Sequence, residues 1–206
     1  MVYTDPNGTP FDLSCPGFLK EQVDLGRHRQ DIAETVRRLP EFQAWWDKEG
    51  NRYLATAMRE IGLPYPYTEV QATLTVCPAV TPMSAPLFMN VRPHLSSAKN
   101  PLPDWQFAFV VFRELMHTYI LPVRPVSELR NKKYASEAQA TLVHLHVPAL
   151  EKFVLTTLGE AEKLRELNEQ YRTRSSATYR RAWEIVSTEG HDAFLKEFKL
   201  ARRQGK

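Results

Sequence analysis

A carboxylate and an imidazole lie close together in an apolar stretch of the chain, and they are the first side chains that could carry out chemistry. The sequence from Val111 to Tyr119 reads VFRELMHTY, so Glu114 and His117 are three positions apart. Residues at this spacing lie on one face of a helix. An imidazole there can bind a metal ion, while a neighbouring glutamate polarises a water molecule on that metal. The pair therefore suggests metal-assisted hydrolysis.

The stretch resembles the HExxH motif of zinc metallopeptidases, with Arg113 at the position of the first histidine. In that motif, two histidines four residues apart bind one zinc ion and the glutamate between them acts as general base. The resemblance implies that Glu114 is the general base and that His117 is a zinc ligand. The alternative is that both residues are structural and are satisfied by hydrogen bonds inside a buried helix.

A second acidic residue, Glu137, follows His117 by twenty positions, near the expected start of another helix. This order is similar to that of the glutamate zincins, which include the thermolysin-like peptidases and take their third ligand from a glutamate on a following helix. The resemblance covers roughly residues 70–158 and implies that Glu137 is a zinc ligand. It also implies that a strand at 86–91 is an edge strand that binds substrate by β-augmentation.

Two further histidines, His144 and His146, follow in the same region. On a continuous helix His144 would lie two turns beyond Glu137 on the same face, where it could support the metal ligands or replace one of them. A hydrogen-bonded core histidine is the alternative for His144. His146 would point elsewhere on such a helix and is the weaker candidate.

Arg113 changes what this site can do. A guanidinium stays protonated at physiological pH and has no lone pair, so it cannot coordinate zinc, and its charge repels a divalent cation. We therefore expect zinc to be lost, or to be held weakly by His117 and Glu137 with His144 as a substitute ligand. We hypothesise that Arg113 replaces the metal electrostatically, through charge-assisted hydrogen bonds to Glu114 or Glu137.

The pattern of apolar residues predicts the elements that position these side chains. Before the motif, helices are expected over 29–46, interrupted by Pro40, and over 52–61, ended by Gly62. Strands are expected over 70–76 and 85–91. Asp104 should cap a buried helix over 105–119. Ser136 should cap the next helix, which should bend near Pro148 and end at Gly159. Amphipathic helices should follow over 160–171, 178–188 and 191–203.

These elements predict a mostly helical α+β fold, zincin-like, with a small sheet beside the active-site helix. We expect one domain over residues 1–206, with 1–26 as an extended arm and 160–206 as closing surface helices. A chain of this length with 43% hydrophobic residues can bury a sizeable core.

Composition excludes several classes of function. With 27 basic and 24 acidic residues, the formal charge of +3 is too small to indicate nucleic-acid binding. We expect no membrane span, since no run of eighteen apolar residues occurs, and no organic cofactor, since there is no glycine-rich phosphate loop. The first residues lack the features of a signal peptide, and the compartment stays open. Cys15 and Cys77 are expected to be free buried thiols, with a single disulfide as the alternative.

Three functions are consistent with these residues. The first is a zinc metallopeptidase that hydrolyses a peptide or protein substrate with Glu114 as base and is impaired by Arg113. The second is a catalytically inactive pseudopeptidase that acts as a binding or structural domain. The third is an unrelated helical interaction module, in which the motif is a coincidence.

Overall fold

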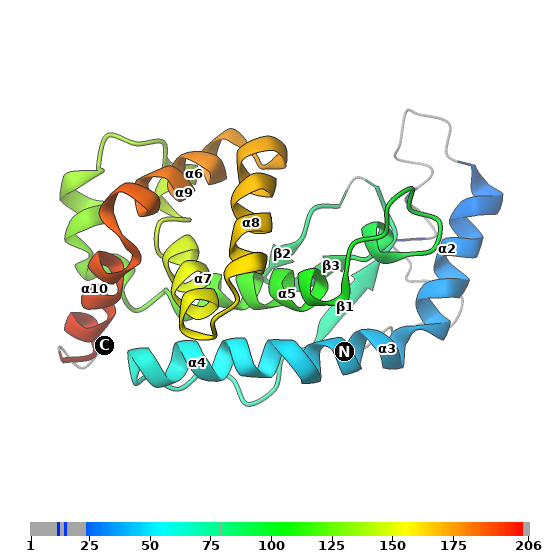
Figure 1. Ribbon diagram of the computed structural model, residues 1–206, viewed down its shortest axis with the longest axis horizontal. Coiled ribbons are helices and arrows are strands. Elements are labelled where there is room, and N and C mark those ends of the chain that lie inside the picture. Colours follow the sequence, from blue (N-terminus) through cyan, green and yellow to red (C-terminus); the bar gives the residue numbers. More distant parts are fainter. Residues whose placement is uncertain (1–11, 13–14, 16–23, 79, 204–206) are drawn as a thin grey trace. The chain divides into compact units, whose positions relative to one another are not determined.

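The structure, a computed structural model, describes residues 12, 15, 24–78 and 80–203, which belong to two compact units. Unit 1 comprises residues 1–52 and 67–115, and unit 2 comprises residues 53–66 and 116–206. Helices α4 (Asn51–Ile61) and α5 (Asp104–Tyr119) each contribute residues to both units. The mostly helical α+β class with a small sheet is confirmed (Figure 1). The single domain stays a prediction.

Proline and glycine set the helix boundaries around α4 as predicted. Helix α2 (Leu25–Arg37) is capped by Asp24, and α3 (Leu39–Trp45) restarts with Pro40 in its first turn. Proline is tolerated there because the N–H groups of a first turn have no intrahelical partner. A π-helical turn, Trp46–Gly50, joins α3 to α4. Gly62, with a φ of 70°, follows the last residue of α4. Glycine adopts this left-handed conformation without steric cost.

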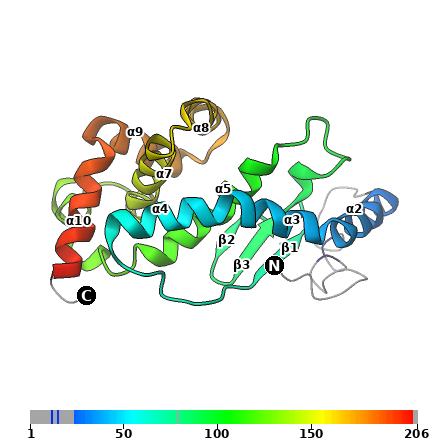
Figure 2. The same ribbon diagram turned by 60° about the horizontal axis from the view of Figure 1, so that its bottom comes forward.

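Three short strands form the sheet of unit 1 in the order β1-β3-β2 (Figure 2). Strand β1 (Ala72–Thr75) pairs parallel to β3 (Leu87–Asn90), and β2 (Met83–Ser84) pairs antiparallel to β3. Both predicted strands are present, but the expectation that the strand at 86–91 lies at an edge is wrong. The chain turns back between β2 and β3, so the two-residue strand β2 covers the outer side of β3. A 3₁₀ turn, Arg92–His94, follows.

The expectation of free thiols is also wrong, because Cys15 and Cys77 form a disulfide with their Cα atoms 5.8 Å apart. Asp12 holds the same segment against the end of β1. Its Oδ1 atom accepts hydrogen bonds from the hydroxyl of Thr75 at 2.5 Å and from the backbone N–H of Val76 at 3.1 Å. These contacts bring together cysteines that are 62 residues apart in the sequence. Residues 24–26, which were predicted to end the extended arm, cap and begin α2 instead, and the rest of the arm lies outside the described residues.

The long helix predicted from Ser136 toward Leu158 is wrong, because the structure has two helices there. Helix α6 (Gln139–Leu142) begins after Ala138 and has no side-chain cap, and α7 (His146–Thr157) follows a turn. Pro148 lacks a backbone N–H and falls in the first turn of α7, where none is needed. A break before Pro148 therefore replaces the predicted bend. Gly159, with a φ of 71°, follows α7 as predicted.

The remaining elements of unit 2 include the three helices expected at the C-terminal end. They are the 3₁₀ turn Arg124–Val126, the π-helical turn Leu129–Lys133, and α8 (Ala161–Arg174), α9 (Ala177–Glu189) and α10 (His191–Arg203). Helix α7 contacts α8, α9 and α10. Phe194 and Phe198 of α10 are fully buried, as are Leu145 and Leu150 at α7. The C-terminal helices therefore supply much of the core of unit 2.

No helix in the described part of the chain combines the length and the apolar character that a membrane span requires.

Candidate functional site

Glu114 lies on α5 within unit 1, where it is 5% exposed. Arg113 donates to its Oε1 atom from Nε at 3.0 Å and from Nη2 at 2.9 Å. The hydroxyl of Ser84, on β2, donates to its Oε2 atom at 2.8 Å. The hypothesised bond between Arg113 and Glu114 is therefore present, and both oxygens of this carboxylate accept hydrogen bonds from the protein.

Local sequence explains why this carboxylate is buried. Asp104 is the first residue of α5 rather than the residue before it, and its carboxylate accepts a hydrogen bond from the backbone N–H of Trp105 at 2.8 Å in the first turn. Phe107, Phe109 and Phe112 then bury α5 in unit 1. A carboxylate in such surroundings needs hydrogen-bond donors and a compensating charge, which Arg113 and Ser84 supply.

His117 and His144 meet in unit 2. Their ring centroids are 5.0 Å apart in an edge-to-face arrangement, and the ring of His144 contacts that of Tyr179 at the same centroid distance. Nδ1 of His144 donates to the backbone carbonyl of Ala140 at 2.5 Å. The structure thus brings two of the predicted metal ligands together. His144 lies in the turn before α7, so the helical face that we expected it to share with Glu137 does not exist.

Glu137 precedes α6 and is not helical, so its predicted place on a following helix is wrong. Arg181, on α9, donates to its Oε1 atom from Nε at 3.0 Å and from Nη2 at 2.6 Å. This pairing lowers the pKa of Glu137 and keeps it ionised. Glu137 and Glu114 are therefore both bonded to arginines in this structure.

The donor set does not fit a zinc site with three protein ligands. Among the residues that the structure describes, no three His, Cys, Asp or Glu side chains come together in a way that could hold a metal ion. Arg113 offers no lone pair, and an arginine that bonds a carboxylate competes with any metal for it. That zinc is lost or weakly held stays a prediction.

Sequence reasoning missed Glu151, a fully buried carboxylate on α7. The hydroxyl of Tyr171 donates to its Oε1 atom at 2.8 Å, and the hydroxyl of Tyr179 donates to its Oε2 atom at 2.6 Å. A glutamate within the apolar run of α7 was the available signal, but its partners lie 20 and 28 residues away. Tyr179 thereby links Glu151 to the histidine pair.

A second missed network joins His146 to Glu197 of α10. Nε2 of His146 donates to Oε2 of Glu197 at 2.8 Å, and the hydroxyl of Ser127 donates to the same oxygen at 2.6 Å. Burial raises the pKa of Glu197, but these bonds and one from the backbone N–H of Leu129 lower it, and the net direction is downward. Because Ser127 and His146 share one carboxylate oxygen, the network holds three segments together.

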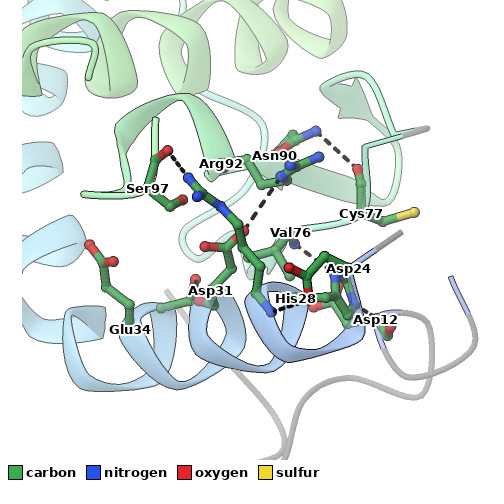
Figure 3. Close-up of polar contacts among 12 residues, drawn as sticks. Asp12, Asp24, His28, Asp31, Glu34, Val76, Cys77, Asn90, Arg92 and Ser97 are labelled. Atoms are coloured by element: carbon green, nitrogen blue, oxygen red, sulfur yellow. Dashed lines mark hydrogen bonds and ion pairs between the residues drawn. The ribbon is translucent and has the colours of Figure 1, made fainter. Parts of the chain in front are cut away.

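Figure 3 shows a third polar network, in which α2 is bonded to Asp12 and to the segment that follows β3. Asp31, which is 2% exposed, lies 3.6 Å from Nε of Arg92. Nε2 of His28 donates to the backbone carbonyl of Asp12 at 2.8 Å, and Nδ2 of Asn90 donates to that of Cys77 at 3.0 Å. These bonds connect elements that are distant in sequence, and we interpret them as structural.

The predicted site residues form different contacts. Glu114 is bonded to Arg113 within unit 1, while His117 and His144 contact each other within unit 2. Glu137 is bonded elsewhere in unit 2. Comparisons of the chain with protein-family models, with curated proteins and with solved structures returned no match.

Proposed function

We propose that this chain is a pseudopeptidase, a zincin-like domain that binds a peptide or protein partner without hydrolysing it. The observation that supports this proposal is the bonding of Glu114, whose two carboxylate oxygens accept hydrogen bonds from Arg113 and Ser84. A general base must direct a lone pair toward the proton that it removes. Arg113 and Ser84 already donate hydrogen bonds to both oxygens of Glu114, which opposes this role.

Electrostatics supports the same proposal. The side chains of Arg113 and Glu114 are 18% and 6% exposed, so their charges interact in surroundings that screen them less than water does. Arg113 compensates the carboxylate and would repel a divalent cation brought to the same place. A pair of this kind preserves the fold while removing the conditions for metal-activated water.

The edge of the sheet is where we place peptide binding. Strand β2 lies at one edge in the strand order, and Met83 on this strand is 44% exposed. An extended peptide can add a strand to such an edge through backbone hydrogen bonds, with an exposed apolar side chain contributing contact area. The adjacent residue of β2 is Ser84, which bonds Glu114.

A weak metal site at His117 and His144 is the second candidate, and their ring contact favours it. The hydrogen bond from Nδ1 of His144 to Ala140 fits this reading, because imidazoles that bind metals usually donate from their other nitrogen to a carbonyl or carboxylate. Metal-dependent hydrolysis at this site would require further metal ligands besides His117 and His144.

Zinc content and hydrolysis distinguish these functions. The chain and the variants Arg113→His and Arg113→Gln would be exposed to zinc, dialysed and measured by elemental analysis and by cleavage of denatured casein. We expect neither zinc nor cleavage in the natural chain and in Arg113→Gln, and about one zinc per chain in Arg113→His. The glutamine variant is the control, because it removes the charge without supplying an imidazole.

Other outcomes would support a different function for the chain. Stoichiometric zinc in the natural chain, with cleavage that Glu114→Gln abolishes, would establish an active peptidase. Zinc that disappears in His117→Ala and in His144→Ala would establish the histidine pair as the metal site. If Arg113→His bound no zinc, the likeness to zincins would lose its support and the interaction-module interpretation would replace it.

The binding part of the proposal has its own measurement. Fluorescein-labelled peptides from a casein digest would be titrated with the chain and followed by anisotropy. We expect binding that Met83→Lys weakens and that Leu121→Lys, which alters a similarly exposed apolar residue of unit 2, leaves unchanged. Equal binding by both variants would exclude β2 as the peptide site.

A further inference from the structure

Arg124 and Arg130 form an arginine pair in unit 2. Arg124 opens the 3₁₀ turn 124–126, and Arg130 lies in the π-helical turn 129–133. Nη1 of Arg130 lies 3.4 Å from the backbone carbonyl oxygen of Arg124. Burial lowers the pKa of Arg124, and the positive charge of Arg130 lowers it further. The guanidinium of Arg130 therefore lies at the backbone of Arg124, and its positive charge also acts on the guanidinium of Arg124.

The hydrogen bonds of this arginine pair leave its charge uncompensated. The Nε atoms of both residues are buried without a hydrogen-bond partner. The guanidinium of Arg124 donates to the backbone carbonyl of Val143 at 3.4 Å, and that of Arg130 to the side-chain oxygen of Asn131 at 3.2 Å. Within the described residues, neither arginine forms an ion pair with a carboxylate.

Three carboxylates lie in these turns or accept hydrogen bonds from them, and all three are bonded to residues other than the two arginines. Glu128 bonds Lys132 at 2.6 Å, and Glu189 bonds Lys133 at the same distance. Glu197 accepts hydrogen bonds from His146, Ser127 and the backbone of Leu129. The protein therefore supplies cations and donors to these acidic groups while the arginine pair keeps its full positive charge.

The segment that carries the arginine pair is held in place by its own hydrogen bonds. Nδ2 of Asn131 donates to the backbone carbonyls of Arg124 and Pro125, each at 3.1 Å. Ser127, which is 1% exposed, accepts from the backbone N–H of Arg130 at 3.0 Å and donates to Glu197. Holding two like charges together in a bonded segment opposes folding, and a bound anion would offset that cost.

We propose that Arg124 and Arg130 form a binding site for an oxyanion, the phosphate or carboxylate group of a small ligand. Guanidinium groups match such anions in geometry and bind them through paired, charge-assisted hydrogen bonds. The Nη groups of the two side chains, whose hydrogen bonds within the protein are 3.2 to 3.4 Å long, would find better acceptors in the bound anion. This site goes beyond the peptide binding proposed above and does not depend on it.

Thermal unfolding and calorimetric titration with simple anions test the site. The chain would be titrated with sodium phosphate and, separately, with sodium acetate, against sodium chloride at equal ionic strength. We expect saturable heat of binding and a rise in Tm of several degrees with at least one of the two oxyanions, because a ligand that binds only the folded state stabilises it. The tighter of the two identifies the preferred group.

Variants assign the binding to these residues. Arg130→Gln should weaken oxyanion binding at least tenfold, and it should keep its far-ultraviolet circular dichroism and its Tm in chloride because it relieves repulsion. Arg124→Lys should weaken binding because it keeps the charge but loses the planar fork. Arg180→Gln is the matched control, since the Nε atom of Arg180 is also buried without a partner. Non-saturable effects, or equal binding by Arg130→Gln, would overturn the proposal.

Discussion

The two units bury the same two kinds of ionisable side chain and satisfy them differently. In unit 1, Glu114 is bonded by the guanidinium of Arg113, while Nδ1 of His94 donates to the backbone carbonyl of Leu102 at 3.2 Å. In unit 2 the pattern is reversed. His146 is bonded to a carboxylate, and Glu151 is bonded by the neutral hydroxyls of two tyrosines.

This difference bears on how buried polar residues are interpreted. Glu114 resembles a catalytic glutamate in its position in the motif, yet the arginine beside it in sequence donates two hydrogen bonds to its carboxylate. Glu151 belongs to no motif, and it is more deeply buried than Glu114. Burial of a carboxylate therefore does not by itself indicate catalysis. The partners of the carboxylate decide whether it can accept a proton from a substrate or from water.

The largest effect is expected at Glu151. Glu151→Ala should lower the free energy of unfolding by about 4 kcal/mol, because it creates a cavity and removes the carboxylate that accepts hydrogen bonds from two buried hydroxyls. Glu151→Gln, which keeps the shape and one acceptor, should cost less. Urea unfolding followed by circular dichroism measures both. Glu162→Ala, at a side chain that is 71% exposed, is the control and should change little. A small effect of Glu151→Ala would show that the tyrosines do not depend on this carboxylate.

A smaller loss is expected when the pair in unit 1 is broken. Arg113→Met should cost about 3 kcal/mol, because it leaves a buried carboxylate without its cation. Adding Glu114→Gln should restore more than half of the loss, and the double-mutant cycle in urea gives the coupling. The exposed pair Arg172 and Glu169, at 2.8 Å, offers the matched cycle and should show little coupling. Additive effects at Arg113 and Glu114 would mean that the arginine does not compensate this carboxylate.

The smallest effect is expected from pH and concerns His94. Burial lowers the pKa of His94 from 6.5 to about 4. Between these values the unfolded chain binds a proton that the folded chain does not, so stability falls as pH decreases from about 6.5 toward 4. From pH 7 to pH 5 we expect this group to remove about 2 kcal/mol of unfolding free energy.

The variant His94→Asn isolates that contribution, because asparagine does not titrate in this range and its amide can donate to the carbonyl of Leu102. Its urea midpoint should therefore depend less on pH than that of the natural chain. Parallel pH curves for the two proteins would show that His94 is not the group responsible.

Sequence by itself determined the features that depend on neighbouring residues. Apolar periodicity located most of the helices, while Pro40, Gly62 and Gly159 placed boundaries correctly because their backbone preferences act locally. The bond between Arg113 and Glu114 could be anticipated because the two residues are adjacent. The bend predicted at Pro148 was wrong, because a proline permits either a bend within a helix or the start of a new helix, and only packing selects between them.

Tertiary structure alone decided the contacts between distant segments. Cys15 meets Cys77, Ser84 meets Glu114 and His117 meets His144, and each pair is separated by at least 27 residues. Local preferences do not encode such contacts, because they depend on the path that the whole chain takes through its core. For the same reason the arginine pair at Arg124 and Arg130 could not be foreseen. The pair keeps its positive charge because the fold bonds the carboxylates of Glu128, Glu189 and Glu197 to other residues.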